Sequence, residues 1–131
     1  MERDLFDAAA AYRGVPHVHG GDNRWGMDCV GLVAAALRDI GVQGVRVPLY
    51  TDERPLQQLI DEMDRAPFLR RRRGIVRGAI CAFDVRRCGH LAIVDGNGMM
   101  VHSTIRGGVQ VATMGEFWSR RLVATYEVAN G

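Results

Sequence analysis

Gly26-Met27-Asp28-Cys29-Val30-Gly31-Leu32-Val33 is the stretch from which the fold of this chain can be inferred. A polar, glycine-rich loop ends here, and an amphipathic helix is predicted to begin at the cysteine. The apolar residues of this helix recur with a 3.6-residue period, at Cys29, Leu32, Val33, Ala36, Leu37 and Ile40. Asp28 is a favourable N-cap residue and Gly41 a favourable C-terminal stop. The pattern therefore places Cys29 in the first helical turn.

Cys29 is a candidate nucleophile because of this position. Unpaired backbone N–H groups and the positive end of the helix dipole favour an anion at a helix start, and a thiolate is such an anion. We expect this setting to lower the pKa of Cys29 below the free value of about 8.5. The alternative is that Cys29 is a small buried core residue, which is common for an isolated cysteine.

The length of 131 residues indicates a single domain over residues 1–131 that can fold without disulfides. A hydrophobic content of 47% and a charged content of 24% are typical of a globular protein, and a net charge of +2 argues against nucleic-acid capture. No apolar run suits a membrane span, and the N-terminus lacks the apolar core of a secretory signal. We expect synthesis in the cytoplasm without a signal peptide and without membrane insertion.

The loop before the cysteine, residues 14–26, is rich in turn-forming, polar and aromatic residues. A loop that leads into a reactive helix start is a natural wall for a substrate. Substrate contacts are therefore expected from His17, His19, Trp25 and Asp28. The two histidines have no second pair of metal ligands nearby, so neither a metal nor an organic cofactor is expected.

The other elements indicate an α+β fold, because helices are predicted first and strands second. Helices are predicted at residues 4–12, beside the helix that starts at Cys29, and after a cap at Thr51 or Asp52. Strands are predicted at residues 79–85, 90–95, 99–104, 108–112 and 122–128, as a meandering antiparallel sheet of about five.

Two further local patterns lie outside these strands. Thr113 and Glu116 have the spacing of a capping box, which predicts a short helix over residues 114–119. The arginine run Arg70–Arg73 contains no aromatic residue and is predicted to be a solvated loop, since runs of like charge are usually exposed.

His90 and His102 lie on two predicted strands joined by Gly96-Asn97-Gly98. A thiol nucleophile needs a base, usually a histidine held by a third polar group. Strand side chains alternate between faces, so the loop length decides whether the two rings can meet. A two-residue loop puts them on opposite faces, whereas a three-residue loop pairs Asp95 with Met99 and puts them on one face. We predict the three-residue loop, with its last glycine at a positive φ.

Three blocks of this sequence, residues 28–33, 89–94 and 101–103, resemble the NlpC family of papain-like cysteine peptidases, which cut peptides of bacterial peptidoglycan. Residues 14–21 resemble the glycine-proline-aromatic loop of that family, with His17 where an aromatic is usual. The loop is closest in style to the short peptidases of phage tails and gene transfer agents, where a histidine often occupies the place of His19.

The resemblance implies a papain-like α+β fold with Cys29 as nucleophile, His90 as general base and acid, and His102 as the residue that orients His90. It implies cleavage of the peptidoglycan stem between D-glutamate and the diamino acid. It also implies location in a phage-like tail, with tail or tail-hub proteins as partners. A structural tail-tip adaptor or plug, or an amidase or transacylase with the same triad, are the alternatives.

Overall fold

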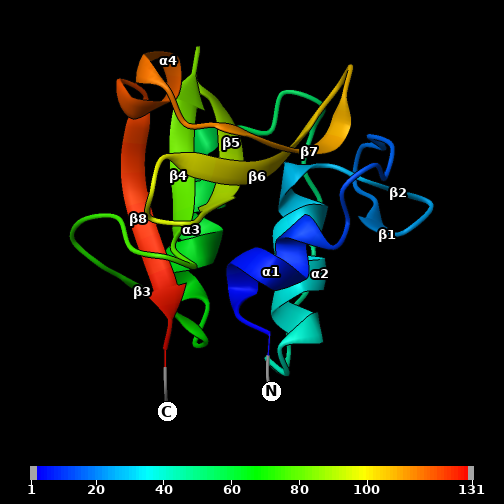
Figure 1. The fold of residues 1–131 in the computed structure, drawn as a ribbon, viewed down its shortest axis with the longest axis horizontal. Helices are drawn as coiled ribbons and strands as arrows, with labels where there is room; N and C mark the ends of the chain where they lie inside the picture. Colours follow the sequence, from blue (N-terminus) through cyan, green and yellow to red (C-terminus); the bar gives the residue numbers. More distant parts are fainter. Residues whose placement is uncertain (1–2, 130–131) are drawn as a thin grey trace.

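The computed structural model describes residues 3–129 and has the expected α+β layout (Figure 1). Its helices are α1 (Leu5–Ala10), α2 (Cys29–Asp39), α3 (Leu56–Arg65) and α4 (Glu116–Ser119). Its strands are β1 (Asp22–Asn23), β2 (Gly26–Met27), β3 (Leu69–Arg71), β4 (Ile80–Val85), β5 (Cys88–Val94), β6 (Met99–Thr104), β7 (Gly108–Thr113) and β8 (Leu122–Val128). Within residues 3–129, no helix is long and apolar enough to cross a membrane.

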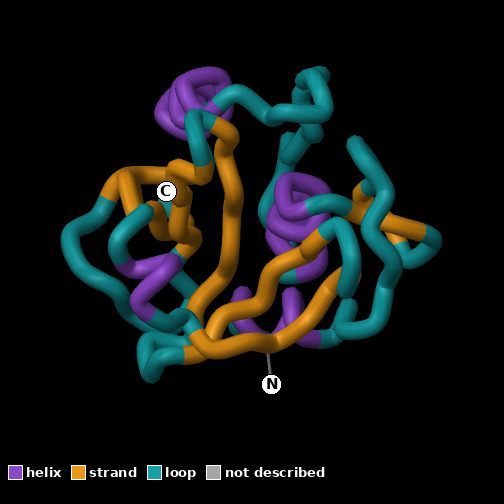
Figure 2. Tube along the Cα trace, turned by 90° about the horizontal axis from the view of Figure 1, so that it is seen from above, coloured by secondary structure: helices purple, strands orange, loops and turns teal. Residues whose placement is uncertain are grey.

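The main sheet has six antiparallel strands in the order β3-β8-β4-β5-β6-β7, and Figure 2 shows it curving around α2. One face packs on α1, α2 and α3 through a core that includes Ile80, Leu91, Ile93, Val101 and Tyr126. The opposite face carries a smaller cluster formed by Cys81, Phe83, Ala92, Val94 and Met100, partly covered by Trp118. The sheet therefore has two buried faces with different partners.

The structure confirms the hairpin register on which the histidine pair depends. Ile93 pairs with Val101, and the Asp95 backbone N–H donates to the Met99 carbonyl at 3.0 Å, so three residues form the loop. Gly98 has a φ of +96°. The strand alternation then puts His90 and His102 on one face of the sheet, as predicted.

Helix α2 also begins and ends where the sequence indicates. Asp28 is its N-cap and accepts a 2.8 Å hydrogen bond from the Gly31 backbone N–H. Gly41 follows the last turn with a φ of +94°, which glycine adopts without strain. Cys29 is thus the first residue of the helix.

The predicted caps of helices α3 and α4 are wrong. Helix α3 begins at Leu56 after Pro55, not after Thr51 or Asp52, and its first N–H donates to the Arg87 carbonyl at 2.9 Å. A backbone partner on the neighbouring hairpin thus replaces the side-chain cap. Helix α4 has Gly115 as its N-cap, with no side-chain hydrogen bond. Thr113, the cap predicted from the sequence, belongs to strand β7.

The arginine run is not a loop, which corrects the second local prediction. Residues Leu69–Arg71 form the edge strand β3, paired with β8, and this adds the sixth strand. Arg70 and Arg72 pair with Glu127 at 2.6 and 2.8 Å, and Arg71 pairs with Asp64 at 2.9 Å. Acidic partners from α3 and β8, distant in sequence, thus hold the run in an extended conformation.

The glycines around Cys29 allow the loop to pack directly against the helix backbone. A Cβ at Gly31 would lie 1.7 Å from the Gly21 carbonyl oxygen, far inside van der Waals contact. The same carbonyl accepts the Asp28 backbone N–H at 3.3 Å. Glycine at position 31, two residues after Cys29, therefore allows α2 to pack directly against the loop.

Replacing Gly31 with alanine should lower the free energy of unfolding by about 3 kcal/mol, since the clash is with backbone that cannot rotate away. Urea denaturation measures this change. Gly115→Ala is the matched control, because a Cβ there meets no atom within 4 Å, and it should cost less than about 1 kcal/mol. Equal stability of the two variants would contradict the packing described.

Candidate active site

Cys29 lies at the start of α2, buried at 1% exposure against strand β5. Burial raises the pKa of its thiol to about 11, while the Arg54 charge and the backbone N–H groups of Leu91 and Val30 act in the opposite direction. The expectation of a lowered pKa is therefore wrong for the free protein. The helix start supplies its donors, but the loss of hydration outweighs them.

His90 and His102 form a buried hydrogen-bonded pair on the sheet face that Trp118 of helix α4 partly covers. His90 Nε2 lies 2.8 Å from His102 Nδ1, and the rings meet nearly edge to face at 81°. Burial lowers the pKa of both rings, and the charges of His102, Arg54 and His17 lower that of His90 further. Both rings are thus neutral near pH 7, with one proton shared along the hydrogen bond.

The contact between α2 and β5 brings the thiol and this pair together. The backbone N–H that faces the Cys29 sulfur belongs to Leu91, the residue directly after His90. Since His90 Nε2 is bonded to His102, Nδ1 is the ring nitrogen that remains for the thiol. The arrangement contains a nucleophile, a base and a group that fixes the base, which is what acyl transfer needs.

Trp118 covers the histidine pair and was not identified from the sequence. Its indole stacks on His90 with centroids 4.7 Å apart and planes 24° apart, and it meets His102 edge-on at 5.5 Å. It reaches them from the four-residue helix α4. The sequence shows that this residue is aromatic. It does not show its position, which depends on how β8 and α4 pack against the sheet.

His17 and His19 lie in different environments. His17 is half-buried, with Nδ1 3.3 Å from the Ser103 hydroxyl, which itself donates to the Met27 carbonyl. The hydroxyl therefore accepts from His17 Nδ1–H. His19 is exposed and meets the Tyr50 ring edge-on at 5.1 Å, with Nε2 3.1 Å from the Tyr50 carbonyl oxygen.

Asp28 is fully buried, and its carboxylate holds together the structure around the thiol. Its oxygens accept from the Gly20 and Gly31 backbone N–H groups, each at 2.8 Å, and from the Tyr50 hydroxyl. Burial and the neighbouring Asp28 charge raise the pKa of Tyr50. Tyr50 is a second site residue that the sequence did not reveal, because it lies 22 positions after its partner.

Trp25 lies outside this cluster. It is 89% exposed in the turn between β1 and β2, where its backbone N–H bonds to the Asn23 side chain at 2.9 Å. In the described residues, no aromatic contact joins it to His90 or His102. The structure therefore brings Cys29, His90, His102 and His17 together but leaves Trp25 on the surface.

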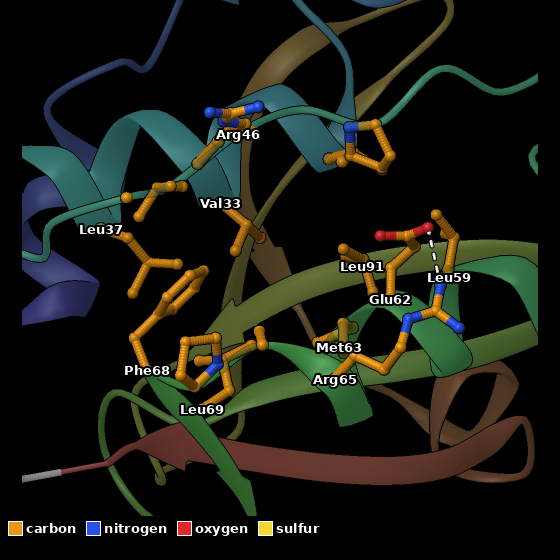
Figure 3. A pocket seen from close by; sticks show the side chains of 17 residues that line it. Val33, Leu37, Arg46, Leu59, Glu62, Met63, Arg65, Phe68, Leu69 and Leu91 are labelled. Atoms are coloured by element: carbon orange, nitrogen blue, oxygen red, sulfur yellow. Dashed lines mark hydrogen bonds and ion pairs between the residues drawn. The ribbon is translucent and has the colours of Figure 1, made fainter.

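An apolar hollow of about 250 Å³ borders the site without containing it (Figure 3). It is lined by Val30 and Leu91, each next to a site residue in sequence, and by Val33, Leu37 and Phe68. Charged side chains stand at its rim, including a Glu62–Arg65 ion pair at 3.0 Å. The chemistry lies with the thiol and the imidazoles beside this hollow.

A thiol at a helix N-terminus, packed on a sheet that carries a bonded histidine pair, is an arrangement suited to a cysteine peptidase. The chain belongs to the NlpC/P60 family, whose sequence profile matches residues 14–127. It is 29% identical over 119 residues to a protein of Escherichia coli K12 called murein DD-endopeptidase MepS/murein LD-carboxypeptidase. That alignment covers 89% of this chain and 57% of the relative, so the chain spans little more than half the relative's length.

Solved structures show the same fold. The NlpC/p60 domain of the peptidoglycan hydrolase SagA has a TM-score of 0.67 at 19% identity, covering 96% of both chains. The peptidoglycan hydrolase RipB of Mycobacterium tuberculosis has a TM-score of 0.65 at 19% identity, covering 96% of this chain and 64% of its own. At these identities the likeness establishes the α+β NlpC/P60 fold.

Replacing Trp118 with alanine should raise the pKa of His90 towards the ordinary value of about 6.5, because water then reaches the charged imidazolium. NMR titration of the imidazole resonances measures the change. Phe117→Ala removes a neighbouring, half-exposed ring from the same helix and should leave the titration in place. An unshifted His90 in Trp118→Ala would show that the indole does not control hydration of the pair.

The buried pair also predicts a loss of stability in acid. The folded state holds both imidazoles neutral, so the unfolded chain binds more protons below its histidine pKa of about 6.5. Stability should therefore fall as the pH drops from about 6.5 towards 5, by up to about 1.4 kcal/mol per pH unit for each histidine. Urea denaturation across this range should give a smaller slope for His102→Gln, and an identical slope would contradict the argument.

Proposed function

We propose that this domain is a cysteine peptidase that cleaves peptides of bacterial peptidoglycan by acyl transfer. The observation that carries the proposal is the 2.8 Å bond between His90 and His102 on the sheet against which the Cys29 thiol packs. The name of the MepS relative, a murein endopeptidase, supports the substrate class.

The geometry suggests how the residues would act. With His90 Nε2–H donating to His102 Nδ1, His90 Nδ1 accepts the proton of the Cys29 thiol as the sulfur attacks the substrate carbonyl. Backbone N–H groups at the start of α2 stabilise the oxyanion that forms. The carbon–nitrogen bond then breaks, and the amine leaves with the proton from His90. Water, deprotonated by His90, hydrolyses the thioester and restores the thiol.

The raised pKa of Cys29 fits this sequence of steps. The free site holds a neutral thiol beside a neutral imidazole, so the proton moves within the pair when the substrate arrives. The imidazolium keeps its hydrogen bond to His102, which stays an acceptor in both states. His102 thus fixes the tautomer and orientation of His90.

We propose that the bond cleaved joins D-glutamate to the diamino acid of the stem. The resemblance of the three sequence blocks to the NlpC family supports this choice. The name of the MepS relative favours a second candidate, DD-endopeptidase or LD-carboxypeptidase activity on neighbouring bonds. The products released from stem peptides separate the two, because each cleavage leaves fragments of different mass.

We also propose that the protein acts in a phage-like tail, bound to tail or tail-hub proteins. The style of residues 14–21, with His19 in its place, supports this location. The arginine run lends it no support, since Arg70, Arg71 and Arg72 pair with acidic residues of the same chain. Co-sedimentation of the protein with tail particles from its producing cells tests the location.

Cleavage of purified stem peptides should depend on Cys29 and His102 in different degrees. Cys29→Ala should lower kcat/KM by about 10³-fold or more, because it removes the nucleophile. His102→Asn keeps a hydrogen-bonding group beside His90 and should lower it by less, about 10-fold to 100-fold. Mass spectrometry of the products over time gives both values.

Arg73→Gln is the control, since Arg73 is exposed after the edge strand β3, and strands β8 and β4 lie between β3 and β5. The proposal fails if wild-type protein leaves every stem peptide intact while Cys29 reacts readily with an alkylating agent. That outcome would favour an adaptor, or an amidase or transacylase with another substrate.

A further inference from the structure

Arg54 is held in an uncommon backbone conformation beside the strand that carries His90. Its φ is +48°, in the left-handed region that non-glycine residues rarely adopt. Its carbonyl accepts the Gly89 backbone N–H at 2.6 Å, and the next residue, Pro55, pairs with Cys88. Arg54 thus keeps a strained backbone conformation while it is bonded to Gly89, the residue directly before His90.

The side chain of Arg54 is also bonded to Gly89. Its Nε donates to the Gly89 carbonyl at 3.1 Å, and Nη1 lies 3.4 Å from the Asp52 carbonyl. In the described part of the chain, no carboxylate lies within 4.0 Å of its guanidinium. Two of five N–H donors are therefore used, both on neutral acceptors, and the charge has no counter-ion.

The charge of Arg54 reaches the reacting groups. It lowers the pKa of Cys29, His90 and His17, all of which are neutral near pH 7 in the free protein. Asp28, whose charge acts on Cys29 and His17, is buried and already bonded to Gly20, Gly31 and Tyr50. The free site therefore presents one fixed positive charge beside the thiol.

We propose that Arg54 is the specificity residue that binds a carboxylate of the substrate next to the scissile bond. A guanidinium with free parallel N–H groups matches a carboxylate in geometry and charge, and its attachment to Gly89 sets its position relative to His90. This inference rests on the proposed peptidase function. Arg54 is a binding residue here and takes no part in proton transfer.

Two carboxylates of a stem peptide could meet this arginine. A glutamate linked through its side chain keeps its α-carboxylate on the acyl side of the scissile bond. A diamino acid carries its own carboxylate on the amine side. The shared chemistry is a carboxylate within one residue of the bond, and amidation of one or the other separates the two sources.

The first experiment needs no cleavage and compares two alkylating agents on Cys29. Iodoacetate carries a carboxylate and iodoacetamide does not, and both transfer a carbon to the sulfur with loss of iodide. In a Cys88→Ser background, the ratio of the iodoacetate rate to the iodoacetamide rate should fall about tenfold in Arg54→Gln and less in Arg54→Lys. Mass spectrometry of the peptide that contains Cys29 gives both rates.

Arg73→Gln is the matched control, since it removes the same charge from an exposed position after β3 and should leave the ratio in place. If Arg54→Gln slows both reagents equally, Arg54 acts only on the pKa of the thiol. That result overturns the proposal.

The second experiment uses stem peptides with the acyl-side or the amine-side carboxylate amidated. Wild-type kcat/KM should fall about 10-fold to 100-fold for one of the two amides, and Arg54→Gln should remove that preference. An unchanged preference in Arg54→Gln overturns the proposal. If no peptide is cleaved by the wild type, the proposed function fails, and the alkylation ratio still decides whether Arg54 binds a carboxylate.

Discussion

The buried carboxylate of Asp28 is the interaction on which the site depends. It joins three segments that are separate in sequence, through Gly20 in the loop, Gly31 in helix α2 and Tyr50 in the connection to α3. A charge buried this deeply is tolerated only when its oxygens are bonded, and each bond here holds one wall of the space around Cys29. Removing the carboxylate would release the start of α2, the loop at Gly20 and the segment at Tyr50 together.

A second constraint is the burial of the site away from water. The thiol and both imidazoles are buried, so hydration favours none of their charged forms, and all three are neutral in the free protein. Trp118 on one side of the sheet and the packed start of α2 on the other maintain this state. Low hydration also strengthens the interactions that would stabilise charge during the reaction, namely the backbone donors and Arg54.

The family relationship and the site suit each other, with local differences that bear on specificity. The family's usual aromatic in the loop is His17 here, tied to Ser103 through Nδ1. Tyr50 donates from its hydroxyl to Asp28 and also contacts the His19 ring. The candidate catalytic residues thus lie within the family's fold, with His17 and Tyr50 bonded close to them.

The sequence by itself determined the features that depend on near neighbours. Helical periodicity and a capping aspartate are local, so the start of α2 at Cys29 was predictable. The strand period and the length of the glycine loop are local too, so the shared face of His90 and His102 followed from counting residues. The five strands were predicted in kind for the same reason, with boundaries that shifted by one or two residues.

Only the tertiary structure decided the features that depend on distant partners. Residues Leu69–Arg71 form strand β3 because β8 and Asp64 provide their partners, and α3 needs no side-chain cap because Arg87 supplies a carbonyl. Burial is likewise a property of the whole fold, so the raised pKa of Cys29 could not be inferred from its helix position. The same holds for Trp118, Tyr50 and Arg54, since no local pattern records which side chains meet across the sheet.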